Sequence, residues 1–406
     1  MLRTVLRVWA ISWLAMGGAA ADTVSAASPS RTDVLDAINA SSNGDTVLVP
    51  AGSAGWSGQI SIGKAITLQG AGVGSTIIRN QSDGFIFSVS CTSAGRIRIT
   101  GFELQGEGSD GTWGMTFSGD KWAEYQVDNC KFEFFGERAI RNEGLLQGLI
   151  YDCSFVNCFK TVDVYGGNYM NESWQEALTL GTTRACVVED CSFFYDSQFS
   201  ASQGATSSRG QGGRSVWRFN TWKNTKPGLD FFPILDCHGN QARVSGQNPT
   251  VDPPGGTGTH RGTRQFEAYG NTFHSDAGGG ANMRLTDLRG GTIIMFENVF
   301  TGGDMQDGFK AREEDGPNNR GFLSGFPGYD SHWMWFWDNL SNGQPITTVD
   351  FTYNHDPNFL IEGTNYFFRS PRAGDPIVQS YTPLAYPHPW RQVLPPPKSP
   401  RGFREP

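Results

Sequence analysis

A short phrase of alternating apolar and polar positions returns along the chain. It is clearest in VDNCKF (127–132), IYDCSF (150–155) and VEDCSF (188–193). Looser copies are ITGFEL (99–104), WRFNTW (217–222), AYGNTF (268–273), MFENVF (295–300) and FWDNLS (336–341). Each copy is a short β-rich stretch with Gly or Asn nearby, whereas sustained helical periodicity is almost confined to the N-terminus. The pattern predicts a series of short strands.

The copies predict a solenoid. Their shared central position is Phe102, Cys130, Cys153, Cys191, Asn220, Asn271, Asn298 and Asn339, at spacings of 28, 23, 38, 29, 51, 27 and 41 residues. No unit could bury its apolar face alone, but stacked units bury a continuous core. We therefore predict an all-β fold, a single-stranded parallel β-helix whose coils are separated by loops of variable length.

The recurring cysteines suggest either an internal stack or a disulfide or metal framework. Equivalent positions of successive coils lie ~4.8 Å apart, so Cys130, Cys153 and Cys191 should form an inward stack. Asparagines in the same place could hydrogen-bond along the axis. The chain has seven cysteines, an odd number, and none forms a C-x-x-C pair, so zinc is poorly supported. One disulfide remains the alternative.

The ends of the chain differ from its middle. Residues 1–21 combine two arginines, an apolar run too short to span a bilayer and small residues up to Ala21, as in a signal peptide. We expect a secreted or periplasmic protein. Residues 22–382 should form the β-helix, capped by a short helix after Ser30, which with Asp33 resembles a capping box. The proline-rich tail, 383–406, should lie along or beyond the last coil.

Charge excludes some partners. The chain has 32 basic and 40 acidic residues, and without the two leader arginines the count is 30 against 40. Phosphate backbones attract basic stripes, so we do not expect nucleic acid as a partner. No segment after the leader approaches the length of a membrane span. We expect a monomer.

These motifs resemble the pectate-lyase-like superfamily of right-handed parallel β-helix proteins. The likeness rests on DVLDAINASSNGDTVLVPAG…ITLQGAGVGSTII, on the DNCKF/YDCSF/EDCSF turn and on YTPLAYPHPW, and it covers most of residues 30–390. Within the superfamily the chain looks most like bacterial secreted β-helix repeat proteins. The resemblance implies a right-handed coil, and the superfamily includes lyases, hydrolases, epimerases and binding proteins. No stretch matches the catalytic motif of pectate lyases, pectin esterases or polygalacturonases, so no catalytic residue is carried over.

Inserts between coils are the places where sites are expected. In the insert after Asn220, Asp236 and His238 flank Cys237, so both should face away from it. Arg264 returns one coil later. Together they could supply an acid, a base and a cation for an anionic sugar. The alternative is a solvated turn with structural ion pairs.

Two arginines, Arg284 and Arg289, precede the strand at TIIMF. A guanidinium can grip the carboxylate of a uronic acid in bidentate fashion, which makes both candidates for substrate binding. The alternative for Arg289 is that it braces the Gly-Gly turn by bonding backbone carbonyls.

The densest charge cluster is GDMQDGFKAREEDGPNNRGF. β-Elimination on a uronic acid needs a cation for the carboxylate, a base for the neighbouring carbon-bound proton and an acid for the leaving oxygen. Lys310 and Arg312 could serve as base and cation, with Glu313 as a catalytic carboxylate. Glu314 and Asp315 could hold Ca²⁺. A solvated charged loop is the alternative.

Three tryptophans alternate with apolar residues in SHWMWFWDN. If Met334 and Phe336 face the core, Trp333, Trp335 and Trp337 point outward in a row, where sugar rings could stack on them. They could instead be buried under a loop or under the proline-rich tail.

The sequence therefore predicts a polysaccharide lyase that acts on an acidic polymer by β-elimination. Two alternatives stay open. One is a glycoside hydrolase with paired carboxylates drawn from Glu313, Asp315 and Asp236. The other is a non-catalytic carbohydrate-binding or cell-surface protein that uses the tryptophan row.

Overall fold

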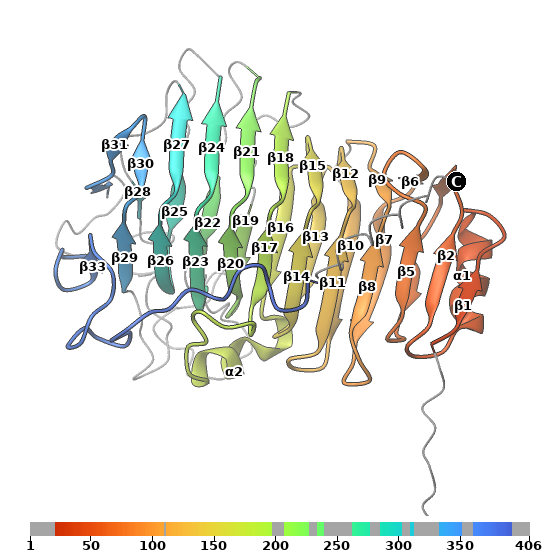
Figure 1. Ribbon diagram of the computed structural model, residues 1–406, viewed down its shortest axis with the longest axis horizontal. Helices are drawn as coiled ribbons and strands as arrows, with labels where there is room; N and C mark the ends of the chain where they lie inside the picture. Colours follow the sequence, from red (N-terminus) through yellow and green to blue (C-terminus); the bar gives the residue numbers. More distant parts are fainter. Residues whose placement is uncertain are drawn as a thin grey trace, which may run out of the picture.

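The computed structural model describes residues 21–108, 111–196, 207–226, 234–238, 262–276, 285–302, 309–311, 333–350 and 360–391, except the side chains of 207–210. In these ranges the strands form three long sheets, here called A, B and C, whose strand pairs are almost all parallel (Figure 1). Each coil adds one strand to each sheet in turn. The fold is a parallel β-helix, as predicted.

Sheet A contains β1 (Thr23–Ser25), β2 (Thr46–Val49), β5 (Thr67–Gly70), β8 (Ile97–Thr100), β11 (Glu124–Asp128), β14 (Gln147–Tyr151), β17 (Cys186–Glu189), β20 (Arg214–Arg218), β23 (Gln265–Tyr269), β26 (Thr292–Phe296), β29 (Met334–Trp337) and β33 (Tyr366–Phe367). Sheet B contains β3 (Gly52–Trp56), β6 (Thr76–Asn80), β9 (Glu103–Gln105), β12 (Lys131–Glu133), β15 (Ser154–Val156), β18 (Ser192–Tyr195), β21 (Thr221–Asn224), β24 (Thr272–Ser275), β27 (Val299–Gly302), β30 (Leu340–Ser341) and β31 (Gln344–Pro345).

Sheet C contains β4 (Ile60–Ile62), β7 (Gly84–Cys91), β10 (Thr112–Gly119), β13 (Arg138–Glu143), β16 (Lys160–Tyr165), β19 (Ser207–Gly210), β22 (Leu235–Cys237) and β25 (Thr286–Leu288). A short parallel pair, β28 (Phe309–Lys310) and β32 (Val349–Asp350), follows, and a bridge between Leu288 and Ala311 joins β28 to β25. Sheet C therefore continues toward the C-terminal coils.

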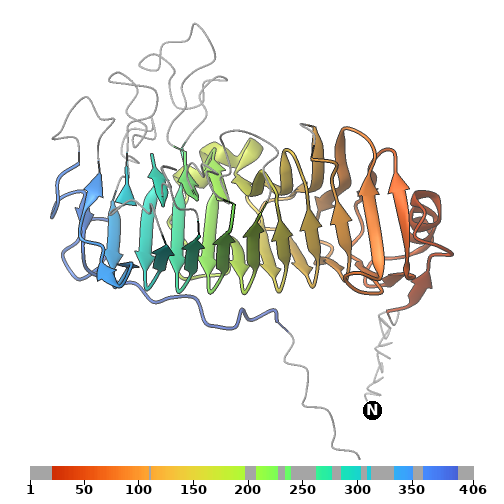
Figure 2. The ribbon, with the colours of Figure 1, turned by 90° about the horizontal axis from the view of Figure 1, so that it is seen from above.

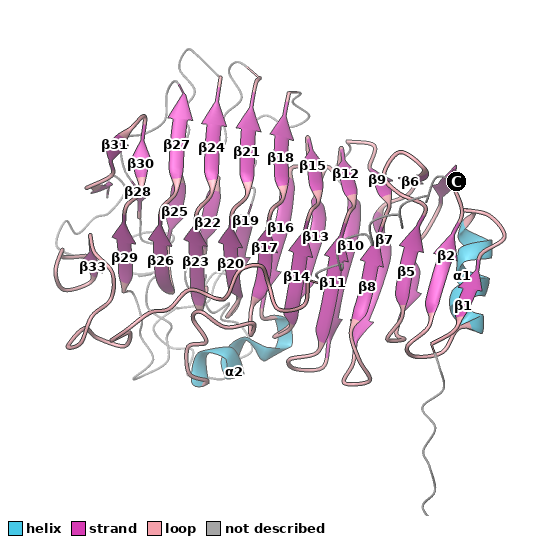
Figure 3. Ribbon diagram, in the orientation of Figure 1, coloured by secondary structure: helices cyan, strands magenta, loops and turns pink. Residues whose placement is uncertain are grey.

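In the described part of the chain, two α-helices accompany the coils (Figure 3). The helix α1 (Arg31–Ala40) closes the N-terminal end, and the side chain of Ser30 accepts a hydrogen bond from the backbone N–H of Asp33 at 3.2 Å, as the sequence predicted. The second helix, α2 (Met170–Gln175), follows a 3₁₀ turn (Gly167–Tyr169) in the insert between β16 and β17. Among the described residues, neither helix is long and apolar enough to cross a membrane.

In successive coils, one residue of the turn from sheet A to sheet B has a positive φ angle, in the left-handed region of the backbone. These residues, with their φ angles, are Gly101 (77°), Asn129 (50°), Asp152 (49°), Asp190 (52°), Phe219 (56°), Gly270 (65°), Glu297 (53°) and Asp338 (53°). Glycine, asparagine and aspartate tolerate this conformation better than other residues do. This explains why Asn or Asp precedes the recurring cysteine in DNC, YDC and EDC.

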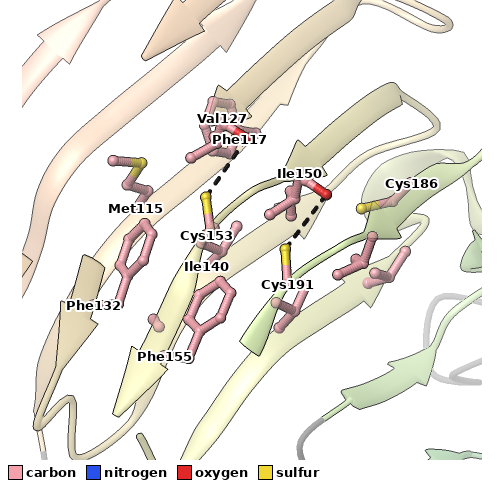
Figure 4. Packing of buried hydrophobic residues seen from close by; sticks show 14 of the residues in the cluster. Met115, Phe117, Val127, Phe132, Ile140, Ile150, Cys153, Phe155, Cys186 and Cys191 are labelled. Atoms are coloured by element: carbon pink, nitrogen blue, oxygen red, sulfur yellow. Dashed lines mark hydrogen bonds between the residues drawn. The ribbon is translucent and has the colours of Figure 1, made fainter. Parts of the chain in front are cut away.

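The position after this turn points into the core (Figure 4). The Sγ of Cys153 lies 3.8 Å from the carbonyl oxygen of Val127, and the Sγ of Cys191 lies 3.7 Å from that of Ile150. All seven cysteines are free and buried, so the disulfide alternative is wrong. Burial raises the pKa of the Cys91 and Cys158 thiols to about 12.

Asparagines replace the cysteines in the later coils and form the expected ladder. The Nδ2 of Asn220 donates to the Oδ1 of Asn271 at 3.0 Å. The same bond joins Asn271 to Asn298 and Asn298 to Asn339, at 2.9 Å each. Each amide also bonds a backbone carbonyl, so the buried polar groups of the turn are paired from coil to coil.

The C-terminal strap, which we define as residues 378–391, returns along the outward face of sheet A (Figure 2). The hydroxyl of Tyr381 donates to Glu267 at 2.6 Å, and Arg218 donates to the carbonyl of Ala385 at 3.0 Å. Farther toward the N-terminal coils, the backbone N–H of His388 donates to Glu189 at 3.1 Å. The part of the tail described here, 383–391, thus lies along the coils.

The strap covers a second apolar cluster outside the coil. Outward residues of sheet A, Leu149, Val187, Val216, Ile294 and Trp335, pack with Val378 and Leu384 of the strap. Sheet A is therefore apolar on both faces, as is typical of a parallel sheet that is covered on both sides.

Candidate functional site

Charged residues follow one outward row of sheet C. Leu235, Cys237 and Leu288 belong to the core, so the residues between and beside them point outward. Asp236 pairs in register with Asp287 of the next coil. Since Ala311 bridges Leu288, Lys310 lies beside Asp287 in the following coil.

Asp236, His238 and Arg289 are in direct contact. The Nη2 of Arg289 donates to one oxygen of Asp236 at 2.6 Å, and the Nε2 of His238 lies 2.8 Å from the other. The Nε of Arg289 lies 3.6 Å from Asp287, so one guanidinium bridges the two carboxylates. The Nη2 of Arg289 also lies 3.1 Å from the Nε2 of His238. The shorter contact, with the Asp236 carboxylate, favours a proton on Nε2 that is donated to Asp236.

Charge and accessibility divide the cluster. Burial alone would raise the pKa of Asp236, but Arg289 and His238 outweigh it and hold that pKa well below its usual range. Asp236 therefore stays ionised at neutral pH. Its side chain is only 6% exposed, whereas that of His238 is 22% exposed. Of these two residues, His238 is the one that a ligand can reach.

Lys310 adds a buried cation. Its backbone N–H donates to the hydroxyl of Thr286 at 2.9 Å, which fixes β28 against β25. Its Nζ lies 3.6 Å from a carboxylate oxygen of Asp350, which is exposed. The outward row thus has the order Asp236, Asp287, Lys310, Asp350.

This arrangement places an oriented imidazole beside a guanidinium and an ammonium on one face. Such a group can move a proton at His238 and stabilise negative charge that develops beside Arg289 and Lys310. Asp236 cannot donate a proton at neutral pH, because it is already ionised.

Comparison with known proteins gives matches to solved structures at low identity and with TM-scores below 0.5. No family model matches the chain, and no curated protein matches its sequence. A solved structure of ORF18 from Geobacillus virus E2 has 14% identity and a TM-score of 0.42, and the match covers 79% of this chain and 58% of the viral one. The crystal structure of an alginate lyase from Paenibacillus sp. str. FPU-7 has 11% identity and a TM-score of 0.44, covering 82% of this chain and 99% of the lyase.

Arg264 contacts the insert that carries α2. Its guanidinium donates to the carbonyls of Ser173 at 3.2 Å and Glu176 at 3.1 Å, and it lies 5.0 Å from the ring of Trp174. These contacts hold the insert that carries α2 against the coils. Its predicted place in substrate binding therefore has no support from its position.

Several predicted site residues lie outside the described part of the chain. They are Arg284, Arg312, Glu313, Glu314 and Asp315. Among the described residues, no group of three or more His, Cys, Asp or Glu side chains could hold a metal ion. The predicted Ca²⁺ site therefore stays a prediction that rests on Glu314 and Asp315.

The predicted row of exposed tryptophans is corrected in part. Met334 and Phe336 do face the core, and Trp335 points outward, but it is fully buried beside Phe367 and donates to Asp375 at 3.2 Å. Trp333 and Trp337 are half-buried against the same outer cluster. A later segment covers the row because sheet A is apolar on its outer face, so Trp335 offers no surface to a sugar.

Sequence reasoning missed two carboxylates on the same face of sheet C, Asp163 and Asp350. Asp163 stands between Val162 and Val164, which are both core residues. Because side chains alternate along a strand, an acid between two buried valines must point outward. The outward position of Asp163 could therefore have been predicted from the sequence. Asp350 follows Val349 in the same way, but its coil could not be assigned from the sequence.

Proposed function

We propose that this protein is a polysaccharide lyase that cleaves an acidic polysaccharide by β-elimination at the outward face of sheet C. The observation that carries the proposal is the contact of His238 with an ionised Asp236, on a face of sheet C that also carries Arg289 and Lys310. A positioned base and a neighbouring positive charge are two of the three groups that the elimination requires, and solvent water can supply the acid.

The proposed roles follow from position. A uronic acid binds against the exposed His238 with its carboxylate on the side of Arg289 and Lys310. The charges of these two buried side chains act at a distance and stabilise the negative charge that grows as the neighbouring C–H bond breaks. His238 takes that proton, the C–H electrons form the carbon–carbon double bond, and the C–O bond to the leaving sugar breaks. The leaving oxygen takes up a proton from solvent water, and His238 later returns its own proton to solvent. Asp236 orients the imidazole by holding Nε2.

The same geometry argues against hydrolysis by Asp236 and Asp287. A hydrolase needs a carboxylic acid that keeps its proton until the leaving group takes it. Asp236 has a lowered pKa, and Arg289 contacts both Asp236 and Asp287. Of the residues predicted for the hydrolase, Glu313 and Asp315 lie outside the described ranges.

The first test is to incubate the mature protein with acidic and neutral polysaccharides while following ultraviolet absorbance and reducing ends. Elimination creates a double bond conjugated to the carboxylate, so we expect both signals to rise with an acidic polymer. Reducing ends without absorbance would show hydrolysis and refute the proposal. Binding without either signal would indicate a carbohydrate-binding protein instead.

Calcium is tested in the same assay. If Glu314 and Asp315 hold Ca²⁺ for the reaction, a chelator should abolish the absorbance change and added Ca²⁺ should restore it. Activity that is equal in chelator and in Ca²⁺ would remove the metal from the proposal and leave the base and cations in place.

We predict that His238→Gln lowers turnover about 100-fold or more, because it removes the base. The matched control is His274→Gln. His274 also pairs with an aspartate, with Nε2 at 2.6 Å from Asp276, but it lies on sheet B. Initial rates with equal amounts of folded protein provide the measurement. A His238 variant with full turnover would exclude His238 as the base.

Lys310→Met tests the cation separately. It keeps the length of the side chain and removes its charge, so we expect lower turnover with polymer binding largely retained. Lys223→Met, on sheet B near Asp276, is the control for a lost ammonium elsewhere. Equal turnover in both variants would remove Lys310 from the mechanism.

A further inference from the structure

The outward face of sheet C carries a second group of residues, N-terminal to the candidate site. We define the sheet C patch as Trp113, Arg138, Arg141, Asp163 and Tyr165, on strands β10, β13 and β16. The guanidinium carbon of Arg138 lies 4.5 Å from the ring centroid of Trp113. That of Arg141 lies 5.6 Å from the rings of both Trp113 and Tyr165. The patch combines two cations with two flat aromatic rings.

The patch and the candidate site lie on one line. Arg141 pairs in register with Asp163, and Asp163 with Ser208 on β19. Ser207 pairs with Leu235 on β22, so the next residue in the row is Asp236. Arg141 is therefore three strand spacings from Asp236, or about 14 Å along the solenoid axis. A linear polymer of several sugar units could contact both.

Two buried polar atoms of the patch lack partners among the described residues. They are the Oδ1 of Asp163 and the Nε of Arg141. The other oxygen of Asp163 pairs with Arg138. Buried polar groups without a hydrogen bond are uncommon in native proteins, so an unpaired acceptor and an unpaired donor on adjacent strands indicate a missing partner such as a ligand.

Arg141 is the cation that a ligand can engage. Arg138 is matched by the buried Asp163, but Arg141 pairs with Glu143, at 2.9 Å from its Nη2. The Glu143 side chain is 40% exposed, and exposed ion pairs contribute little to stability. Displacing Glu143 would open the Nε–Nη2 edge of the guanidinium, the edge that grips a carboxylate through two parallel bonds.

We propose that the sheet C patch is a distal subsite that binds a uronate unit of the polymer, with its carboxylate on Arg141 and its ring against Trp113. A hydroxyl of the same unit donates to Asp163. This inference rests on the proposed function in one respect, because the polymer bound at the patch is taken to be the one that is cleaved at His238. It further states that the polymer lies along the solenoid axis and is acidic at a unit remote from the cleaved bond.

The kinetic test uses Arg141→Ala with oligouronides of increasing length and with the polymer. We expect KM to rise at least about tenfold for chains long enough to span both sites, because a charge-assisted pair is lost. The kcat value and the KM of the shortest cleaved chains should not change. Arg141→Lys keeps the charge but loses the two-pronged grip, so it should rescue only part of the loss.

Arg96→Ala is the matched control. The Arg96 side chain is 31% exposed, against 22% for Arg141, and it pairs with Glu124, which is 36% exposed. Its guanidinium lies 3.9 Å from the ring of Trp390, and Arg96 is on a different face of the coil from the sheet C patch. Trp113→Ala should raise KM for long chains as Arg141→Ala does. Its control is Phe194→Ala, because Phe194 is also half-buried but lies on sheet B. If Arg96→Ala raises KM as much as Arg141→Ala does, the effect is not a subsite and the proposal fails.

A binding arm separates this inference from the proposed function. His238→Gln and the His238→Gln/Arg141→Ala double variant are compared by affinity electrophoresis in polyuronate gels and in gels of the same polymer with methyl-esterified carboxyl groups. We expect weaker retardation of the double variant in the free-acid gel alone. If the double variant is retarded less but the wild-type protein cleaves no polymer, the subsite proposal is supported and the proposed lyase activity is refuted. If cleavage occurs but Arg141→Ala changes neither KM nor retardation, or if no acidic polymer retards the protein, the subsite is refuted.

Discussion

Glu267 shows how one buried side chain couples the strap to pH. It lies on the outward side of sheet A and is fully buried. Both of its oxygens accept from the backbone N–H of Gly181 at 3.1 Å, and one accepts from Tyr381 at 2.6 Å. Burial raises its pKa from 4.5 to about 7, and these bonds and the charge of Arg218 oppose the rise only in part.

The raised pKa predicts a pH-dependent stability. The folded protein holds the Glu267 proton more tightly than the unfolded chain, so its contribution is complete below pH 4.5 and is lost as the pH rises through about 7. Glu267→Gln should remove this dependence. The wild type should lose up to roughly 3 kcal/mol relative to the variant between pH 4.5 and 8. Urea unfolding at both pH values measures it, and parallel profiles would contradict the assignment.

At the scale of elements, the strap explains why sheet A has an apolar outer face. Along the strap, Tyr381 reaches β23, the carbonyls of Leu384 and Ala385 reach β20, and His388 reaches β17. At its end, Arg391 pairs with Asp152 at 3.1 Å and with Asp190. One segment thus contacts four successive coils, those of β23, β20, β17 and β14.

We predict that Leu384→Asp detaches the strap without unfolding the coils. A carboxylate in the outer cluster would be buried without a partner, whereas lifting the strap exposes it to water. Hydrogen exchange should rise in 378–391 and in the 179–185 segment while the Asn ladder stays protected. Thr382→Asp, at an exposed position two residues away, is the control. Equal exchange in wild type and Leu384→Asp would show that the strap is not held by this cluster.

The coils of the β-helix could be predicted from the sequence, but the segment that covers the outer face of sheet A could not be identified. The inward place of Cys130 or Asn271 repeats because every coil has the same tight turn before it, and such local rules are visible in a single chain. Alternation about Cys237 likewise placed Asp236 and His238 on one surface. Alternation also showed that Trp335 points outward, but it could not show that a segment some forty residues later buries it.

The assembly of the candidate site was also beyond the sequence. Arg289 contacts Asp236, and Lys310 lies beside Asp287, because β22, β25 and β28 follow one another along sheet C. The inserts between these strands have unequal lengths, so spacing alone does not say which residue of one coil lies beside which residue of the next. Asp350 was missed for the same reason.

At the scale of the whole molecule, the core holds all seven cysteines as buried thiols. We predict that reductant does not change the melting temperature, because no disulfide contributes to stability. In the native protein the thiols should not react with a disulfide reagent at pH 8, and all seven should react after denaturation. The raised pKa of Cys91 and Cys158 works in the same direction. A thiol count below seven after denaturation would reveal a bond that the structure lacks.

A stack of coils normally unravels from its ends, because a terminal coil has one neighbour where an inner coil has two. The strap changes this order at the C-terminal side. The chain leaves the last coil and is fastened again at Asp152 and Asp190, in the middle of the stack. A protease that nicks an insert near β29 should therefore release no fragment until the fastening at Arg391 also gives way. The severed coils would stay clamped to the rest by their own downstream chain.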